Sequence, residues 1–132
     1  MKKTTAISLL ISLLVLVGCA GNEPAPQAEY RKIDAVQAKE MMAAGEPYVL
    51  LDTRTDEEFS KIRIEGALLI PEYEIKERAE AELPDKQALI LVYCRSGRRS
   101  AIAAYALVDM GYVNVYDFGG IIDWPYNTVS DS

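Results

Sequence analysis

The stretch around Cys94 limits the fold of this chain more strongly than any other part of the sequence. An apolar run at 88–92 precedes the polar segment 94–100, and an alanine-rich run at 101–107 follows it. A short apolar run bounded by polar residues is typical of a buried strand, and alanine has the strongest helix preference. The stretch therefore predicts a strand, a tight loop and a helix, with Cys94 where the strand ends.

Strands and helices alternate along the rest of the chain. Asp34 and Gln37 have the spacing of a capping box, which opens a helix that stops at Gly45. The apolar run at 48–51 predicts a buried strand that ends at Asp52. The other predicted elements are an edge strand at 30–33, a helix at 56–59, a strand within 66–71, a helix over 72–83, a strand at 113–116 and a short helix within 119–124. This alternation predicts a three-layer α/β domain in which helices flank a central parallel sheet, with ligands at the carboxyl ends of the strands.

The first residues have the pattern of an export signal. Lys2 and Lys3 form a short basic start, and the apolar run at 6–17 is too short to span a bilayer comfortably. The tetrapeptide ending at Cys19 resembles the bacterial lipobox, in which the cysteine is lipidated and becomes the first residue of the mature protein. An ordinary signal peptide or an uncleaved anchor is the alternative. By resemblance to Gram-negative lipoproteins, Ala20 after the cysteine favours the outer membrane, with the domain facing the periplasm.

These features divide the chain into four parts. Residues 1–18 are expected to be the lipoprotein signal peptide, and the polar, proline-bearing segment 19–29 a lipid-anchored flexible tether. Residues 30–128 form the single predicted domain, followed by a C-terminal tail at 129–132.

Charge and cysteine content exclude several functions. Removing residues 1–18 leaves 114 of 132 residues and takes away two lysines and no acid, so the net charge changes from −6 to −8. Nucleic-acid binding needs a basic surface and is not expected. With Cys19 lipidated, Cys94 is the only thiol left and has no disulfide partner in its own chain. With no histidine and one thiol left, a zinc site is not expected. No other cofactor is expected.

Three segments resemble the rhodanese-like family, and the resemblance that they carry extends over nearly the whole predicted domain. Residues 52–59 are similar to the family's D-x-R-x-x-x-E-[FY] segment, residues 93–101 to its active-site loop, and residues 119–124 to its closing G-G-x-x-x-W. One segment departs from the pattern. Where the family usually reads G-H-I-x-G-A, this chain has Ile-Arg-Ile-Glu-Gly-Ala at 62–67.

The spacing from Cys94 to Arg99 indicates which group the loop holds. Four residues separate the two, whereas protein tyrosine phosphatases have five between cysteine and arginine, in a loop around phosphate. A shorter loop gives a smaller ring of N–H groups, which suits one added sulfur atom better than a tetrahedral phosphate. The family resemblance implies a persulfide: the Cys94 thiolate takes a sulfane sulfur from a small anionic donor such as thiosulfate and passes it to a thiol acceptor.

The position of Cys94 favours its thiolate without a histidine base. Unpaired N–H groups and the positive end of the dipole gather at a helix N-terminus, and both stabilise a negative sulfur. A free cysteine is only a few per cent thiolate at neutral pH, so such stabilisation increases its reactivity. The alternative is a buried, inert thiol.

The other residues of the loop are candidates for substrate binding. Arg95 and Arg98 are expected to attract an anionic donor, although both also fit a role in solubility alone. Arg99 opposes the helix dipole, so we expect a carboxylate, Asp52 or a nearby glutamate, to hold it in a loop-shaping role. Ser96 and Gly97 provide compact backbone, with Gly97 at positive φ.

The remaining candidates are expected to support the site from behind. Ser100 is a candidate helix cap, and Asp52 and Arg54 are predicted to form a salt bridge at the end of the neighbouring strand. The closing segment is expected to supply turn and core residues, and Tyr93 the core or a pocket wall; the closing residues concerned are Gly119, Gly120 and Trp124.

The sequence therefore favours a membrane-tethered periplasmic sulfurtransferase that acts through a Cys94 persulfide. One alternative is a sulfur-carrier module with little turnover that docks to a periplasmic redox protein. A small phosphatase-like enzyme is a further alternative, and the short loop counts against it.

Overall fold

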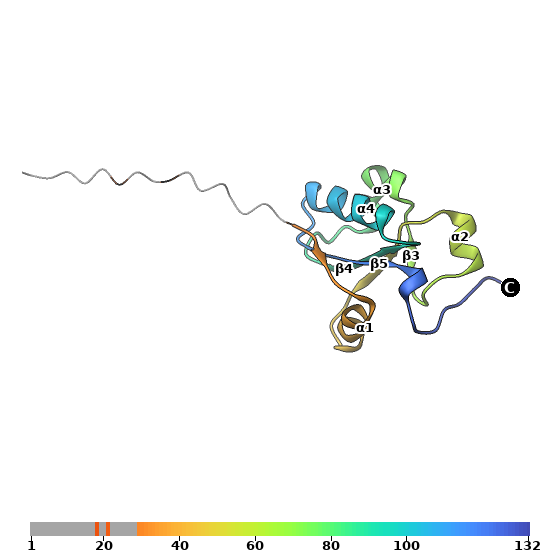
Figure 1. The fold of residues 1–132 in the computed structure, drawn as a ribbon. Coiled ribbons are helices and arrows are strands. Elements are labelled where there is room, and N and C mark those ends of the chain that lie inside the picture. The colour runs from red at the N-terminus through yellow and green to blue at the C-terminus, as the bar shows by residue number, and fades with distance from the viewer. Residues whose placement is uncertain (1–17, 19–20, 22–28) are drawn as a thin grey trace, which may run out of the picture.

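The structure is a computed structural model that describes residues 18, 21 and 29–132 (Figure 1). Cys19 and nearly all of the predicted signal peptide and tether lie outside this range. In the described part of the chain, no helix is both long and apolar enough to cross a membrane.

Five parallel strands form the sheet, in the order β1-β5-β4-β2-β3. Their bounds are Arg31–Lys32 for β1, Val49–Asp52 for β2, Leu68–Leu69 for β3, Leu89–Cys94 for β4 and Asn114–Gly120 for β5. The longest apolar strand, β4, occupies the centre, where both faces are covered. This explains why its sequence is a continuous apolar run without alternation.

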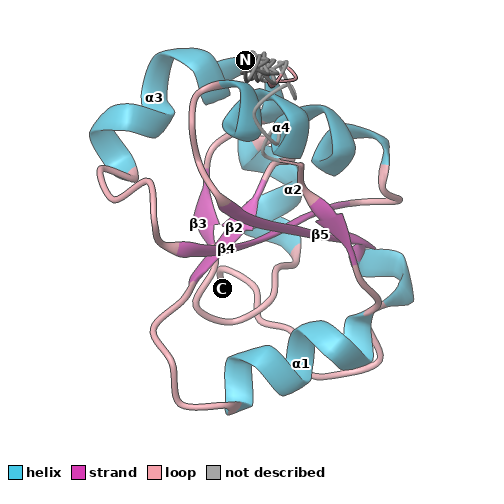
Figure 2. Cartoon of the chain, turned by 90° about the vertical axis from the view of Figure 1, so that its left-hand side faces the viewer, coloured by secondary structure: helices cyan, strands magenta, loops and turns pink. Residues whose placement is uncertain are grey.

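Helices cover both faces of the sheet (Figure 2). The helix α1 (Ala35–Ala43) packs on one face, and α3 (Ile75–Glu82) and α4 (Arg98–Asp109) pack on the other. Neighbouring residues of β4 point to opposite faces, so Val92 joins the core under α3 and α4 while Tyr93 joins the core on the α1 side. The predicted three-layer α/β domain is confirmed.

Local sequence signals place several helix ends correctly. Asp34 Oδ1 accepts a hydrogen bond from Gln37 N at 2.8 Å, and Gln37 Oε1 accepts one from Asp34 N at 3.0 Å, which is the predicted capping box. A second capping box, formed by Thr55 and Glu58, opens α2 (Asp56–Lys61). Figure 1 shows α2 at the end of the molecule where the C-terminus also lies.

Two predicted elements differ in extent. The helix expected over 72–83 begins as a 3-10 turn, η1 (Glu72–Glu74), because Glu74 N bonds to Pro71 O, three residues back, and only then continues as α3. The strand expected at 113–116 runs on to Gly120. Its pairing with β4 continues past an irregularity, and Gly120 pairs with Cys94.

The last residues lie against the domain rather than beyond it. Arg63 and Val129 exchange two backbone N–H···O hydrogen bonds of 2.8 Å, and Arg63 Nη2 lies 2.8 Å from Asp131 Oδ1. The Arg63 guanidinium also lies over the Phe59 ring, 4.6 Å from its centroid. Arg63 is part of the departure from the family pattern, and it joins α2 to the C-terminal residues.

We expect Arg63→Ala to lower the free energy of unfolding by about 1–2 kcal/mol, because it removes a cation–π contact and a hydrogen bond to Phe59 O. Urea unfolding of the full-length chain measures the change. Asp131→Asn removes only the exposed ion pair and should cost less. Equal losses in the two variants would contradict this account.

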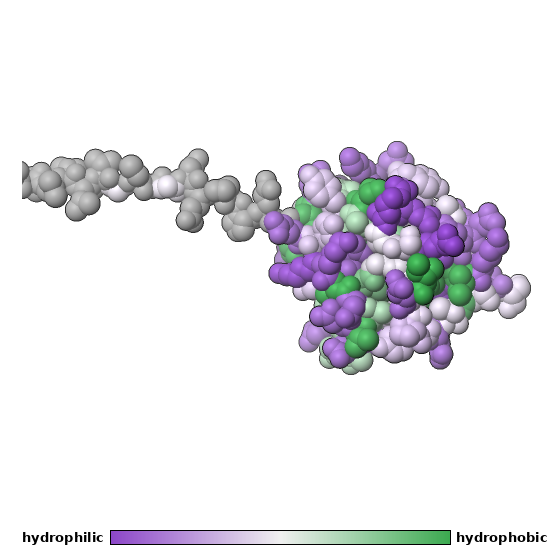
Figure 3. All heavy atoms as spheres, in the orientation of Figure 1, coloured by the Kyte–Doolittle hydropathy of each residue, from purple (hydrophilic) through white to green (hydrophobic). Residues whose placement is uncertain are grey.

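The surface is mostly hydrophilic. On the face drawn in Figure 3, the apolar side chains of the described residues form small separate groups among polar ones. Large exposed apolar side chains do occur singly, and two of them, Ile62 and Ile122, lie beside the loop described next.

Candidate active site

Cys94 ends the central strand and is only 1% exposed. Its sulfur is held by the start of the next helix: Gly97 N donates a hydrogen bond to Sγ at 3.0 Å, and Ser100 Oγ lies 3.5 Å from Sγ. The predicted strand, tight loop and helix therefore place the sulfur against the N-terminus of α4.

Two glycines allow the backbone to adopt this close arrangement around the sulfur. Gly97 has φ +114°, which confirms the predicted positive φ, and it is the residue before α4 begins at Arg98. Gly120 lies directly against the loop, since a Cβ there would be 2.1 Å from Arg95 O and 2.5 Å from Ser96 Cα. The end of β5 thus packs against the backbone that follows Cys94.

Ser100 has a different role from the predicted helix cap. The helix starts two residues before it, so Ser100 occupies the first turn and its hydroxyl is free to turn inward. Ser100 Oγ lies 3.1 Å from Gly97 O and 3.4 Å from Gly119 O, as well as close to the sulfur. Ser100 therefore contacts Cys94 directly rather than supporting it from behind.

The surroundings of Cys94 lower the pKa of its thiol below the ordinary value. Burial is the largest single influence and raises the pKa, because it disfavours the charged form. The Ser100 hydroxyl and three backbone N–H groups act in the opposite direction and together outweigh burial; these N–H groups belong to Ser96, Gly97 and Ser100. Hydrogen-bond donors thus favour the thiolate here, as a histidine base does in other thiol enzymes.

The expected carboxylate partner of Arg99 is Glu58, not Asp52. The two nitrogens Nη1 and Nη2 of Arg99 lie 2.7 and 2.8 Å from the two carboxylate oxygens of Glu58, a bidentate ion pair. Because Glu58 belongs to α2, this pair joins α2 to the first turn of α4. The arrangement fits the loop-shaping role predicted for Arg99.

The Arg99 ion pair lowers the pKa of Glu58 to about 2 from 4.5, mainly through its hydrogen bonds and with help from Thr55, while burial works against this. A carboxyl whose pKa is lower in the folded state contributes stability that is complete above pH 4.5 and lost as the pH falls towards 2. We therefore expect Glu58→Gln to lose part of its stability at pH 7 and to show a flatter decline between pH 4.5 and 2. Urea unfolding of both proteins across this pH range is the measurement, and parallel curves would contradict the prediction.

The predicted salt bridge between Asp52 and Arg54 is present and buried. Arg54 Nη2 lies 2.7 Å from Asp52 Oδ2, and the side chains are 2% and 0% exposed. The same Nη2 donates to Ile62 O at 2.6 Å. The pair thus fixes the end of β2 and the residue that follows α2, next to the Cys94 loop.

The side chains of Arg95 and Arg98 are exposed. Within residues 29–132, neither side chain forms an ion pair, so both remain available to attract an anion. Arg98 already belongs to α4, whereas Arg95 lies in the loop.

Tyr93 belongs to the core rather than to a pocket wall: it is fully buried, and its hydroxyl accepts a hydrogen bond from Ile64 N at 3.1 Å.

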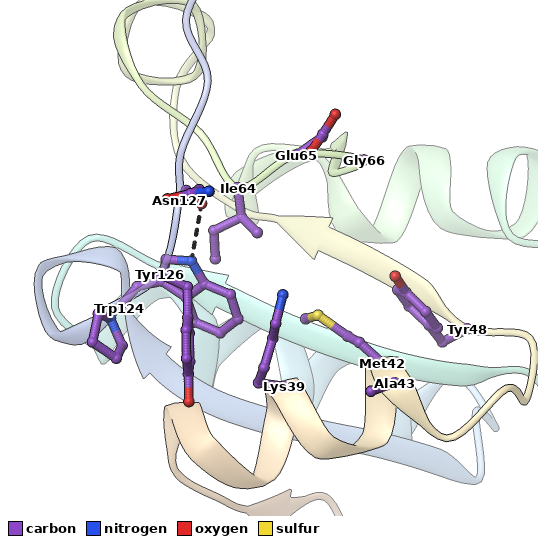
Figure 4. Close-up of a pocket in the computed structure, with 11 residues that line it drawn as sticks. Lys39, Met42, Ala43, Tyr48, Ile64, Glu65, Gly66, Trp124, Tyr126 and Asn127 are labelled. Atoms are coloured by element: carbon purple, nitrogen blue, oxygen red, sulfur yellow. Dashed lines mark hydrogen bonds between the residues drawn. The ribbon is translucent and has the colours of Figure 1, made fainter.

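Two hollows on the surface need to be distinguished. A pocket of about 690 Å³ lies between α1 and the segment after η2 (Ile121–Asp123), and Figure 4 shows Lys39, Met42 and Trp124 around it. No residue of the Cys94 loop lines it. A smaller pocket of about 280 Å³ borders the loop, and its lining includes Arg95, Ile62 and Ile122. The isoleucines were not among the predicted site residues; only the departure at position 62 marked one of them.

The geometry supports attack by the Cys94 thiolate on an electrophilic atom. N–H donors can hold negative charge on the sulfur, or on a sulfur added to it, and the exposed side chains of Arg95 and Arg98 belong to the segment directly after Cys94. In the described part of the chain, acidic residues and cysteine do not gather into a cluster that could hold a metal ion.

Comparison with known proteins gives a consistent result. The Rhodanese-like domain family matches residues 34–125. The thiosulfate sulfurtransferase PspE of Escherichia coli (strain K12) is 40% identical over 73 residues, which is 55% of this chain and 70% of that protein. A sulfurtransferase of Allochromatium vinosum is 37% identical over 94 residues, covering 70% of this chain and 86% of that protein. A solved structure of an E. coli rhodanese with anions is 36% identical and superposes with a TM-score of 0.60, covering 64% of this chain and 99% of that one.

Proposed function

Because the chain belongs to the rhodanese-like family and is a rhodanese-type sulfurtransferase, we propose that it moves sulfane sulfur from thiosulfate to a thiol acceptor through a persulfide on Cys94. The observation that carries this proposal is the placement of Cys94 Sγ against Gly97 N and Ser100 Oγ at the start of α4.

The first half of the reaction loads the cysteine. The Cys94 thiolate attacks the outer sulfur of thiosulfate, and a new S–S bond forms while the bond between the two sulfurs of thiosulfate breaks. The electron pair of that bond leaves with sulfite, and Cys94 becomes a persulfide anion. No proton moves in this step, which fits a site without a general base.

The second half regenerates the thiolate. An acceptor thiolate attacks the outer sulfur of the persulfide, and the Cys94 thiolate leaves. Backbone N–H groups of Ser96, Gly97 and Ser100 hold negative charge on the sulfur that is bound at each stage. Arg95 and Arg98 attract the anionic donor into a protein that is acidic overall.

A mass measurement tests the proposal. After incubation with thiosulfate and removal of the excess, the full-length chain should gain the mass of one sulfur, and Cys94→Ala should gain none. Release of that sulfur to cyanide or to a small thiol separates an enzyme from a low-turnover sulfur carrier. Absence of the gain, or its persistence in Cys94→Ala, would remove the persulfide mechanism.

The pH dependence of loading gives a sharper prediction about Ser100. Because the thiolate is the reactive form and its pKa is lowered, the loading rate should reach its plateau at a lower pH than for an ordinary cysteine. Ser100→Ala removes one hydrogen bond to the charged sulfur and should slow loading about tenfold at pH values below the pKa, with less effect above it. Ser130→Ala, at an exposed serine, is the control. A uniform loss at all pH values would contradict the role assigned to Ser100.

The geometry argues against phosphate hydrolysis. Arg99 is the arginine whose place in the loop is nearest to that of the phosphatase arginine, and both of its terminal nitrogens are hydrogen-bonded to Glu58. The loop is also one residue shorter than the phosphatase loop. We therefore expect no turnover of aryl phosphates. Steady turnover that disappears in Cys94→Ala would contradict this expectation.

The N-terminal pattern supports a proposal about the location of the enzyme. We propose that Cys19 carries the lipid, that residues 19–29 tether the domain to the outer membrane, and that the acceptor thiol belongs to a periplasmic molecule such as a redox protein. Incorporation of labelled palmitate that is lost in Cys19→Ala, together with processing that globomycin blocks, tests the anchor. Labelling that persists in Cys19→Ala would exclude it.

A further inference from the structure

The small pocket beside the loop combines apolar side chains with charged ones. Its apolar part consists of three isoleucines, and its volume is about 280 Å³. An apolar cavity of about 150 Å³ is large enough for benzene, so an aromatic ring or a short alkyl group fits here. Arg95, which lines the pocket, directly follows Cys94; the residues of the lining are Arg54, Glu58, Lys61, Ile62, Arg95, Ile121 and Ile122.

Two exposed isoleucines, Ile62 and Ile122, line the pocket, and the backbone of each is hydrogen-bonded to a residue of the site. Ile62 is 43% exposed and Ile122 63% exposed, although burial of such side chains is normally favourable. Ile62 O accepts a hydrogen bond of 2.6 Å from the buried guanidinium of Arg54. Ile122 N donates one of 3.2 Å to Arg95 O. These bonds hold the backbone of each wall at a set position beside the loop.

Ile62 is also where this chain departs from the family pattern, which has glycine at this position. Glycine has no side chain, so the same pocket would lack this wall. The backbone of the next residue, Arg63, is paired with Val129, which fixes the extended conformation around Ile62. The Ile62–Arg63 departure thus builds an apolar wall and secures it.

Most of the charged side chains around the pocket have an ionic partner. Arg54 is paired with Asp52, Glu58 with Arg99, and Lys61 with Glu57; the N···O distances are 2.7, 2.7 and 2.6 Å. Arg95 lines the pocket and has no carboxylate partner among the residues that the structure describes. The pocket therefore offers a positive charge and an apolar surface within reach of the loop.

From these features we infer that the pocket binds the organic group of a sulfur anion, so that the enzyme prefers organic sulfane-sulfur donors, such as aryl or alkyl thiosulfonates, to thiosulfate. This inference rests on the proposed sulfur transfer and adds its substrate class. With a thiosulfonate, the Cys94 thiolate forms a bond to the outer sulfur, the bond from that sulfur to the sulfonyl sulfur breaks, and the electron pair leaves with the sulfinate. Charge and atoms balance as they do with thiosulfate.

Single-turnover loading of the full-length chain tests the preference. The rate constants of persulfide formation from benzenethiosulfonate and from thiosulfate are measured by mass spectrometry, and their ratio is compared between variants. Ile62→Ala and Ile122→Ala each remove apolar surface from one wall and should lower the ratio about fivefold, with a larger loss in the double variant. Both side chains are exposed, so these variants keep the folded core.

Val113→Ala is the matched control. Val113 is a β-branched residue with 39% exposure, and it precedes β5 at the amino ends of the strands, opposite the loop. Val113→Ala should have the same ratio of loading rate constants as the unmodified chain. An unchanged ratio in both isoleucine variants, or an equal fall in Val113→Ala, would overturn the inference.

A binding measurement separates failure of the pocket from failure of sulfur transfer. In Cys94→Ala, which cannot load sulfur, benzenesulfonate should bind more tightly than methanesulfonate, and Ile62→Ala should reduce that difference about fivefold. If neither donor loads Cys94 but this difference is found, the sulfur-transfer proposal fails and the pocket assignment stands. Equal binding of the two sulfonates would overturn the pocket assignment.

Discussion

Replacing Asp52 with alanine is expected to lower the free energy of unfolding by about 3–5 kcal/mol, because it leaves the Arg54 guanidinium buried without its counter-charge. Asp52 is fully buried and Arg54 is 2% exposed, so water cannot take the place of the lost carboxylate. Asp52 also accepts a 2.9 Å hydrogen bond from Arg54 N, which shapes the backbone after β2. Urea unfolding of the full-length chain measures the loss.

Two comparisons separate the unpaired charge from general damage to the core. In the double variant Asp52→Leu with Arg54→Met, no buried charge remains, and much of the lost stability should return. Glu57→Ala removes an exposed partner of Lys61 and should change the unfolding free energy very little. If the double variant were no more stable than Asp52→Ala, the unpaired guanidinium would not be the cause.

The sequence predicted the parts of this structure that depend on local chemistry. The capping box of Asp34 and Gln37 involves residues three apart, and a buried strand such as 89–94 shows in its own composition. The positive φ of Gly97 follows from a tight turn between a strand and a helix. Such features need no knowledge of what packs against them.

Features that depend on distant contacts were predicted incompletely. The sequence offered Asp52 or a nearby glutamate as the partner of Arg99. In the structure, Arg54 forms hydrogen bonds with both carboxylate oxygens of Asp52, so Arg99 pairs with Glu58 instead. The role predicted for Ser100 was wrong, because that role depends on where α4 begins. The loop before that start also packs against Gly120, which is a contact between segments far apart in the chain.

The departure at 62–63 shows the same limit. The sequence marked these residues as unlike the family but gave no reason for the difference. The structure supplies one, since Arg63 pairs with Val129 across 66 positions of chain and Ile62 lines a pocket with residues that follow β5. Neither partner has a pattern that identifies it from the sequence alone.

Replacing Gly120 with alanine is expected to reduce sulfur loading of Cys94 about a hundredfold, because a displacement of about 1 Å at a reacting group has an effect of that size. The added Cβ would lie 2.1 Å from Arg95 O and 2.5 Å from Ser96 Cα, and both are backbone atoms that can move only if the loop moves. The N–H groups that hold the sulfur belong to this same loop, so the pKa of Cys94 should rise as well. Loading rates and the pH dependence of Cys94 alkylation measure the two effects.

Gly119→Ala is the matched control for this variant. Gly119 has φ +85°, so alanine there costs backbone strain of about 1 kcal/mol, but its Cβ would meet no atom within 4 Å. Gly119→Ala should therefore lose stability while the Cys94 pKa stays close to that of the unmodified chain. Gly120→Ala should instead change the pKa of Cys94 and the loading rate more than it changes the stability. If Gly120→Ala kept both the loading rate and the pKa of Cys94, the close approach of β5 would not be what shapes the sulfur site.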